Sequence, residues 1–118
     1  MGKLVYAKSL YGPPDRVCDM GGETDIKSIG DADFIVNLHM GMRRLLTQNI
    51  SAEEFLAENM EILRGKVLIG DEIGAGVVPI DPFERRWRDE TGTLYQALAK
   101  EADIVDRVWA GLPMRLKG

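Results

Sequence analysis

The sequence is poor in the residues that most often identify a function. Its 118 residues include one cysteine, Cys18, and one histidine, His39. A single thiol cannot form an intrachain disulfide, and without a second cysteine or a histidine cluster no zinc-site spacing is present. The composition therefore argues against a disulfide scaffold and a zinc module. It favours a reducing compartment, the cytoplasm.

Long apolar runs and an excess of positive charge are also missing. No segment approaches the roughly 18 to 20 apolar residues of a membrane-spanning helix, and the start MGKLVYAK lacks the apolar stretch of a secretory signal. The chain carries 15 Lys and Arg against 19 Asp and Glu, a net charge of −4. Because a polyanion is bound largely through Lys and Arg, we expect no nucleic-acid partner, and we expect no membrane partner either.

The residues that are present suit a compact domain. With 45% hydrophobic and 29% charged residues the chain can bury a core, and its length fits one domain over residues 1–118. Apolar periodicity places Trp87 and Trp109 in that core, and Gly92, inside a helical pattern, predicts close packing at its position. The same periodicity predicts helices over residues 3–11, from Asp31 or Asp33 to about Asn49, over 52–64 and over 82–101.

Two of these helices begin with capping signals. Ser51 and Glu54 form an S-x-x-E capping box, in which a hydroxyl and a carboxylate satisfy unpaired amides of the first turn. Asp81 precedes Pro82, and Glu84 stands three residues after Asp81. This pattern predicts that the longest helix begins at residue 82.

Short apolar runs predict the strands. Residues 17–18 fit a short strand. The run over 66–70 has the apolar, branched centre Val67-Leu68-Ile69, which is typical of a strand covered on both faces in a parallel sheet. Residues 104–109 alternate in polarity, and 114–116 fit an edge strand. Because strand, loop, helix and strand follow one another over 66–110, we predict a βαβ unit. The fold class is then α/β, with a small, mainly parallel sheet flanked by helices.

Chemistry is expected where the strand over 66–70 ends, since open parallel sheets bind ligands outside the carboxyl ends of their strands. Asp71 and Glu72 stand there, followed by Gly74 and Gly76. The carboxylates can hold Mg²⁺ through water, and the glycines let a backbone approach a ligand closely. The alternative is a tight glycine loop whose acids are only solvated.

Three arginines lie near the start of the longest helix. Arg85, Arg86 and Arg88 can present guanidinium groups to phosphate or to an amide-rich ligand. The interleaved acids Glu84 and Asp89 make an ordinary ion-paired helix face equally plausible.

The second half of the chain resembles a known family, the adenosylcobinamide kinases/adenosylcobinamide-phosphate guanylyltransferases of cobalamin biosynthesis. The resemblance covers about residues 66–118. In the N-terminal half it is limited to Gly2-Lys3 and the following helix, which look like the tail of a phosphate-binding loop. The matched positions, in family order and spacing, are Asp71-Glu72-Ile73-Gly74-x-Gly76-Val77-Val78-Pro79, Arg85-x-x-Arg88-Asp89, Gly92, Gln96-x-Leu98-Ala99, Ala102-Asp103 and Gly111-x-Pro113-x-x-Leu116-Lys117.

The resemblance implies a P-loop fold that phosphorylates the aminopropanol hydroxyl of cobinamide and then transfers GMP from GTP. It implies GTP or ATP with Mg²⁺ as cofactors, and a nucleotide and a corrinoid as partners. Candidates for nucleotide or phosphate binding are Gly2, Lys3, Arg85 and Arg88, and candidates for metal or substrate are Asp71, Glu72, Gly74 and Gly76.

The chain also departs from the family pattern. A phosphate-binding loop needs a strand, a glycine-rich turn, a Lys and a Ser or Thr for Mg²⁺, but here the strand and most glycines are missing and Leu4 follows Lys3. The region nearest to the family's acidic metal residue reads FIVNLHM, with Asn37 in a helical pattern. His39 lies elsewhere in the order than the family's guanylylated histidine, so we give it a structural role.

Two function classes follow from this comparison. The first is a cobinamide kinase/guanylyltransferase-like protein, catalytically degenerate as numbered. The second is a noncatalytic subunit that binds a nucleotide or a corrinoid or acts in assembly. A purely structural domain, with Lys3 as a solvated helix residue, is a third possibility. A small sheet without its usual first strand also invites self-association, so we expect a homo-oligomer.

Overall fold

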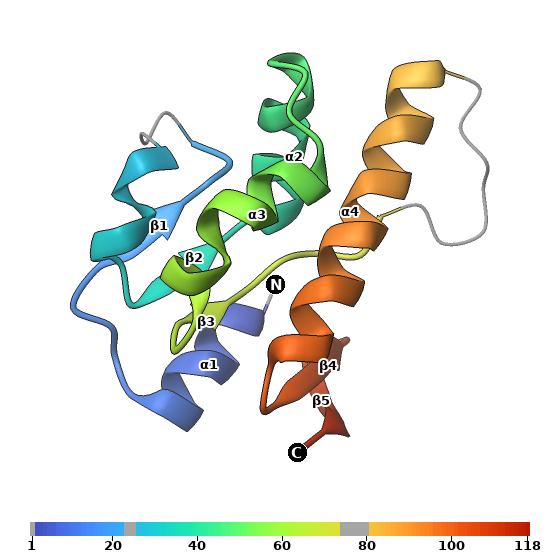
Figure 1. Ribbon diagram of the computed structural model, residues 1–118. Helices are drawn as coiled ribbons and strands as arrows, with labels where there is room; N and C mark the ends of the chain where they lie inside the picture. Colours follow the sequence, from blue (N-terminus) through green and yellow to red (C-terminus); the bar gives the residue numbers. More distant parts are fainter. Residues whose placement is uncertain (1, 23–25, 74–80) are drawn as a thin grey trace.

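The computed structural model describes residues 2–22, 26–73 and 81–118 (Figure 1). Gly74 and Gly76 lie outside these ranges. In chain order the elements are α1 (Lys3–Tyr11), β1 (Val17–Asp19), the short 3-10 helix η1 (Ile26–Asp31), β2 (Phe34–Val36), α2 (Leu38–Thr47), α3 (Ala52–Leu63), β3 (Val67–Leu68), α4 (Pro82–Glu101), β4 (Val105–Trp109) and β5 (Leu112–Lys117).

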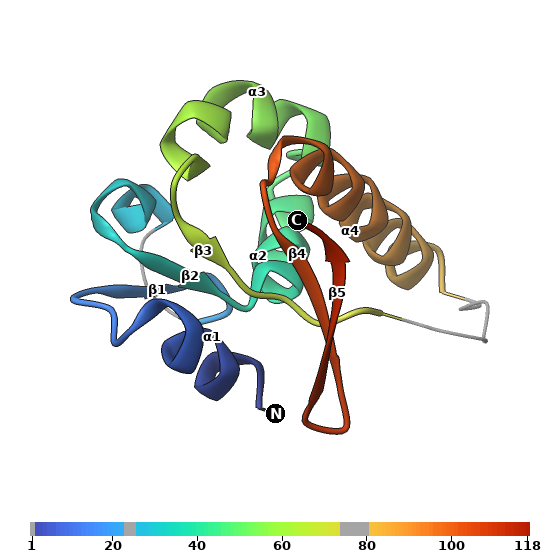
Figure 2. The same ribbon diagram turned by 90° about the horizontal axis from the view of Figure 1, so that it is seen from below.

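The centre of the fold is a parallel sheet in the order β1-β2-β3. Val17 of β1 pairs with Phe34 of β2, which in turn pairs with Val67 of β3. Figure 2 shows α1 on one face of this sheet and α2, α3 and α4 on the other. The predicted class, α/β with a small parallel sheet flanked by helices, is confirmed.

The hydrophobic core lies between the sheet and the three helices on its second face. Ile35 of β2 and Met42 of α2 are fully buried, and Phe55 of α3 and Leu94 of α4 are nearly so. β2 reads as a continuous apolar run because it is the central strand, and both Phe34 and Ile35 are covered.

The helix predicted from Asp31 or Asp33 to Asn49 is wrong in its first part. Residues 34–36 form β2, and α2 begins only at Leu38. Between them Asn37 takes a left-handed conformation, with φ 58°, which turns the chain from strand to helix. A short run such as FIV fits both a buried strand and a helix face, so periodicity alone cannot decide between them.

The predicted βαβ unit over 66–110 is also wrong. β4 does not pair with β3; it forms an antiparallel hairpin with β5. The hairpin turn is Ala110-Gly111, and both residues have positive φ, 51° and 77°, as a type I′ turn requires. The strand after α4 therefore finds a neighbour two residues later in the chain, without the crossover that a parallel pair needs.

The remaining helix predictions are confirmed within a residue. Ser51 Oγ accepts a hydrogen bond from the Glu54 amide, and Asp81 accepts from the amides of Phe83 and Glu84. The predicted strand at residues 17–18 corresponds to β1. None of the helices in the described part of the chain has the length and apolar character needed to cross a bilayer.

Three packing predictions fail. Trp109 is 76% exposed, because it lies on the outward face of the hairpin. A side chain added at Gly92 would meet nothing within 4 Å, so close packing does not explain that glycine. Residues 66–70, predicted to be covered on both faces, are only half-buried. Trp87, in contrast, packs against the core as predicted.

Candidate functional site

Polar side chains follow each strand of the parallel sheet. β1 ends at Asp19, Asn37 follows β2, and Asp71 comes after β3. Because the strands are parallel, these positions share one edge of the sheet. Asn37 Nδ2 donates to Asp19 Oδ1 at 2.8 Å, and the Gly21 amide donates to the same oxygen at 2.9 Å.

Lys3 and Asp71, two residues proposed as candidates from the sequence, meet at this edge. Lys3 Nζ lies 2.7 Å from Asp71 Oδ1, although the residues are 68 positions apart. The hydrogen bond from the Lys3 ammonium lowers the pKa of the Asp71 carboxyl below its ordinary value. Gly2, at the start of α1, has φ 91°, a left-handed conformation that favours glycine.

His39 completes this group from the first turn of α2. Its Nδ1 accepts a hydrogen bond from the Asp71 amide at 3.1 Å, so the neutral ring carries its proton on Nε2. Nε2 lies 3.6 Å from Asp71 Oδ2. Burial lowers the pKa of His39, while the carboxylates of Asp71 and Asp19 act in the opposite direction.

We call Lys3, Asp19, Asn37, His39 and Asp71 the strand-end cluster. It combines an ammonium group and an amide with two carboxylates and an imidazole. An ammonium suits a phosphate group, and carboxylates suit a divalent cation held through water. In residues 2–22, 26–73 and 81–118, no set of three or more His, Cys, Asp and Glu side chains gathers as a metal site.

The middle of α4 closes one side of the strand-end cluster. Tyr95 Oη donates to the Asp71 carbonyl at 2.6 Å, and burial raises the pKa of this phenol. A Cβ at Gly70 would lie 2.2 Å from Tyr95 Oη and 3.0 Å from Leu38 Cβ. Position 70 therefore has no room for a side chain, and this glycine lets α4 approach the end of β3.

Glu72, another predicted candidate, is directed toward the hairpin. Its Oε1 lies 2.8 Å from Arg107 Nε of β4, and both side chains are at least half exposed. An exposed ion pair of this kind contributes only about 0 to 1 kcal/mol to stability. Its structural effect is to link the segment after β3 to β4.

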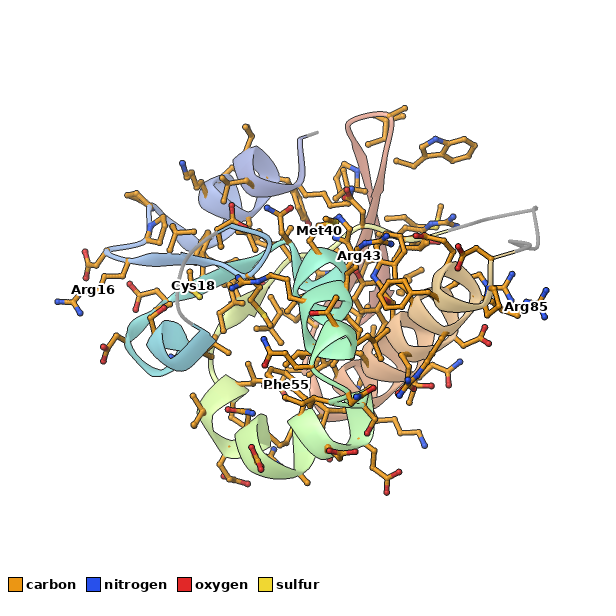
Figure 3. The ribbon with its side chains drawn as sticks, turned by 90° about the horizontal axis from the view of Figure 1, so that it is seen from above. Arg16, Cys18, Met40, Arg43, Phe55 and Arg85 are labelled. Carbon is orange, nitrogen blue, oxygen red and sulfur yellow. The ribbon has the colours of Figure 1, made fainter. Side chains whose placement is uncertain are left out.

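The arginines of α4 are not gathered with the strand-end cluster. Arg88 pairs with its neighbour Asp89 at 3.2 Å, and Figure 3 shows Arg85 pointing outward from the start of α4. Arg85 precedes Tyr95 by ten residues, which separates them by about 15 Å along the helix axis. Of the two alternatives for these arginines, a ligand contact or an ion-paired helix face, the second describes the observed contact of Arg88.

A different arginine holds the first turn of α4. Arg43 of α2 lies 2.5 Å from Glu84, and its guanidinium stacks on the rings of Phe83 and Trp87. The Trp87 indole also donates to the His39 carbonyl at 2.7 Å. These contacts join α4 to α2 beside the strand-end cluster.

Sequence reasoning missed three members of the strand-end cluster as site residues. Asp19, Asn37 and His39 were not candidates, because the short strands before them were weak or were assigned to a helix. One signal was available: Asp19 and Asn37 each follow an apolar run directly, and Asp71 follows one after a single glycine. A polar residue after each of several short apolar runs indicates the ligand-binding edge of a parallel sheet.

The fold and the strand-end cluster show that the chain is an α/β domain with a parallel sheet. A group of polar side chains lies at the carboxyl ends of the strands of this sheet. Residues 33–116 match the family described as cobinamide kinase / cobinamide phosphate guanyltransferase, and the chain belongs to this family. The suspected resemblance is thereby confirmed. The P-loop-like α/β fold implied by the family is consistent with the small parallel sheet.

A curated relative supports the same assignment. Over 66 residues the chain is 46% identical to the bifunctional adenosylcobalamin biosynthesis protein CobP of Pseudomonas aeruginosa. The matched region is 55% of this chain and 38% of that protein. The matched region thus spans well under half the length of this relative.

Proposed function

We propose that this chain acts in cobalamin biosynthesis as a cobinamide kinase/guanylyltransferase-like protein that binds a nucleotide at the strand-end cluster but is catalytically degenerate. The observation that carries the proposal is the contact between Lys3 and Asp71. It brings a candidate phosphate ligand and a candidate metal ligand together at the edge where parallel sheets bind ligands.

Nucleotide binding at this place requires Lys3 to exchange partners. A phosphate oxygen replaces Asp71 Oδ1 as the acceptor for the ammonium group, and the Asp71 carboxylate, 55% exposed, becomes available to a Mg²⁺ ion held through water. Magnesium nucleotide brings both groups at once, which offsets the loss of the ion pair. We therefore expect GTP or ATP to bind better with Mg²⁺ than without it.

Three features argue against efficient phosphoryl transfer. Leu4 provides no hydroxyl for Mg²⁺, Asn37 is neutral where an acid would hold the metal, and its amide is engaged with Asp19. Phosphoryl transfer depends on positioning and charge stabilisation, so these losses remove catalysis before they remove binding. Transfer of labelled phosphate to cobinamide should be several orders of magnitude slower than ordinary turnover, at about 1.4 kcal/mol of barrier per factor of ten.

A second candidate is a noncatalytic assembly subunit. The exposed side chains of Trp109, Leu112, Met114 and Leu116 favour it, because large apolar side chains grouped on one hairpin are typical of contact surfaces. In this alternative the chain is a single domain, residues 1–118, that self-associates in the cytoplasm. Sedimentation across a concentration series tests self-association, and it is independent of nucleotide binding.

The nucleotide proposal is tested by thermal stability with Mg²⁺ plus GTP, ATP or cobinamide. A ligand at 100 times its Kd stabilises the folded state by about 2.7 kcal/mol. Lys3→Met should weaken nucleotide binding by at least about tenfold, a loss of about 1.4 kcal/mol. The matched control is Lys8→Met, in the last turn of the same helix. Equal nucleotide responses in both variants would overturn the site, and no response in the unmodified chain would favour the assembly alternative.

A further inference from the structure

Asp106 of β4 is a nearly buried carboxylate outside the strand-end cluster. Its side chain is 11% exposed, although every residue of the neighbouring strand β5 is exposed. Tyr6 Oη of α1 donates to Asp106 Oδ2 at 2.8 Å, and Arg115 Nε of β5 donates to Oδ1. Burial alone would raise the pKa of the Asp106 carboxyl, but the bonds from Arg115 and Tyr6 hold this pKa below its ordinary value. Asp106 is therefore ionised at neutral pH and held at both oxygens.

Tyr6, the partner of Asp106, lies one turn from Lys3 on α1. Residues three apart in a helix are neighbours on one face, so Tyr6 and Lys3 belong to the same face of α1. Lys3 bonds Asp71 in the segment after β3, whereas Tyr6 bonds Asp106 on β4. The face of α1 that carries the candidate phosphate ligand is thus tied to two separate parts of the molecule.

Apolar packing contributes little to the position of α1. In Lys3–Tyr11, all of which the structure describes, Ala7 is the only buried residue, and Val5 and Leu10 are exposed. A helix of nine residues is too short to be stable by itself, so its position depends on tertiary contacts. The two directional side-chain bonds therefore have a large share in placing this helix.

Phosphate binding would remove one of these two bonds. In the proposed function the Lys3 ammonium leaves Asp71 for a phosphate oxygen, and α1 is then no longer tied to the segment after β3. The bond from Tyr6 to Asp106 is not exchanged, because Asp106 lies outside the strand-end cluster. This bond can keep α1, and with it the ammonium group, in place while the partner of Lys3 changes. A group that is already held in place loses less conformational freedom when a ligand binds.

We propose that Tyr6 and Asp106 are positioning residues for nucleotide binding: Asp106 holds the Tyr6 hydroxyl, and Tyr6 fixes the turn of α1 from which Lys3 reaches a nucleotide phosphate. Arg115 supports them, because its guanidinium forms a charge-assisted bond that orients the Asp106 carboxylate. This role rests on the proposed nucleotide binding at Lys3 and extends the site to the C-terminal hairpin. Without the bond between Tyr6 and Asp106 the chain should fold but bind nucleotide less tightly.

The test compares two tyrosine variants of the same helix. Tyr6→Phe removes only the hydroxyl that bonds Asp106, and Tyr11→Phe is the matched control at the exposed last residue of α1. Binding of GTP and of ATP, each with Mg²⁺, is measured by isothermal titration calorimetry on the full chain. Tyr6→Phe should weaken nucleotide binding by about threefold to tenfold, the range expected for one hydrogen bond, and Tyr11→Phe should not.

A double-mutant cycle determines whether Tyr6 acts through Lys3. In the Lys3→Met background there is no ammonium group to place, so the addition of Tyr6→Phe should not weaken nucleotide binding further. Asp106→Ala should weaken binding as much as Tyr6→Phe does. Asp106→Asn keeps an oxygen acceptor for the Tyr6 hydroxyl and should retain most of the affinity.

A measurement without nucleotide tests whether the Tyr6 hydroxyl holds α1 in place. By NMR, the amides of α1 should exchange at least about threefold faster in Tyr6→Phe than in Tyr11→Phe, while exchange at Ile69, which bonds β2, stays the same. Unchanged exchange in α1 overturns the positioning role. Equal nucleotide affinity in the two tyrosine variants also overturns it, as does an equal loss of affinity with and without Lys3. If the unmodified chain binds no nucleotide, the proposed function itself fails, and the positioning role fails with it.

Discussion

The parallel sheet and the C-terminal hairpin are both built from short apolar strands, yet they differ in how far those strands are buried. In β2, Phe34 and Ile35 are 3% and 0% exposed. In β5 every residue is exposed, and Leu112 is 73% exposed. The difference comes from layering: helices cover both faces of the parallel sheet, whereas in the described part of the chain no helix or strand covers one face of the hairpin (Figure 2).

Polar contacts hold the hairpin in place where apolar packing does not. Tyr6 Oη donates to Asp106 at 2.8 Å, Arg107 pairs with Glu72, and Lys117 donates to the Ala99 carbonyl at 3.0 Å. The Tyr6–Asp106 bond is partly buried, whereas the other two contacts are exposed and contribute little free energy each. All three are directional. The comparison teaches that the core determines the stability of this domain, and that the hairpin is positioned by side chains from α1, α4 and the segment after β3.

The largest expected change in stability comes from truncating a core side chain in the parallel sheet. Ile35→Ala removes a fully buried side chain from the central strand and should lower the free energy of unfolding by about 2 to 5 kcal/mol. Leu112→Ala on the hairpin is the control and should change it by no more than about 0.5 kcal/mol. Urea unfolding followed by circular dichroism measures both. Similar losses for the two variants would contradict the division into a packed region and an uncovered one.

A smaller effect is expected at the start of α4, the helix that connects the two regions. Asp81 Oδ1 accepts from the Phe83 amide at 2.7 Å and from the Glu84 amide at 3.3 Å, so Asp81→Ala should cost about 1 kcal/mol. Asp81→Asn keeps the acceptor and should cost less. Nucleotide responses should be unchanged in both, because Asp81 lies outside the strand-end cluster. If Asp81→Ala kept full stability, the Asp81 side chain would not cap α4 in solution.

Local signals explain which parts of this fold are predictable from the sequence. The starts of α3 and α4 depend on Ser51 and Asp81, whose side chains bond amides two or three residues away. β2 depends instead on having neighbours on both sides, and no local pattern in Phe34-Ile35 distinguishes that from a helix face. The antiparallel partner of β4 depends on the Ala110-Gly111 turn, which lacks the Asn-Gly or Asp-Gly signature of hairpins.

The candidate site, like the fold, is only partly predictable from the sequence. Lys3 and Asp71 are identifiable by residue type and by position next to a helix start or a strand end. Their contact is not identifiable, because it spans 68 positions and depends on how α1 packs against the sheet. His39 carries no sequence signal beyond its residue type, since its importance comes from the Asp71 amide, a backbone group.

The turn of the hairpin offers the next effect in size. Ala110 has φ 51°, a left-handed conformation in which the Cβ atom is strained, so Ala110→Gly should stabilise the hairpin by about 0.5 to 1 kcal/mol. The gain should appear as slower amide exchange at Trp109 and Met114, with little change in the unfolding of the core. A uniform increase in protection throughout the chain would show that the hairpin and the parallel sheet unfold as one unit.

The smallest effect concerns His39, at the junction between the two regions. Burial holds the pKa of His39 in the folded chain below its ordinary value of 6.5, so the unfolded chain takes up more protons as the pH falls through that value. The folded state should therefore lose stability as the pH falls below about 7.5, until His39 is protonated in the folded chain as well. His39→Asn keeps an acceptor for the Asp71 amide and should remove this slope, because the chain has no other histidine.

The pKa of Asp71 is lowered too, but its contribution is lost only as the pH falls below about 4. Urea unfolding across the pH range measures the slope. A stability that rises on acidification in the unmodified chain, and not in His39→Asn, would mean that the carboxylate of Asp71 outweighs burial and that the imidazolium pairs with it.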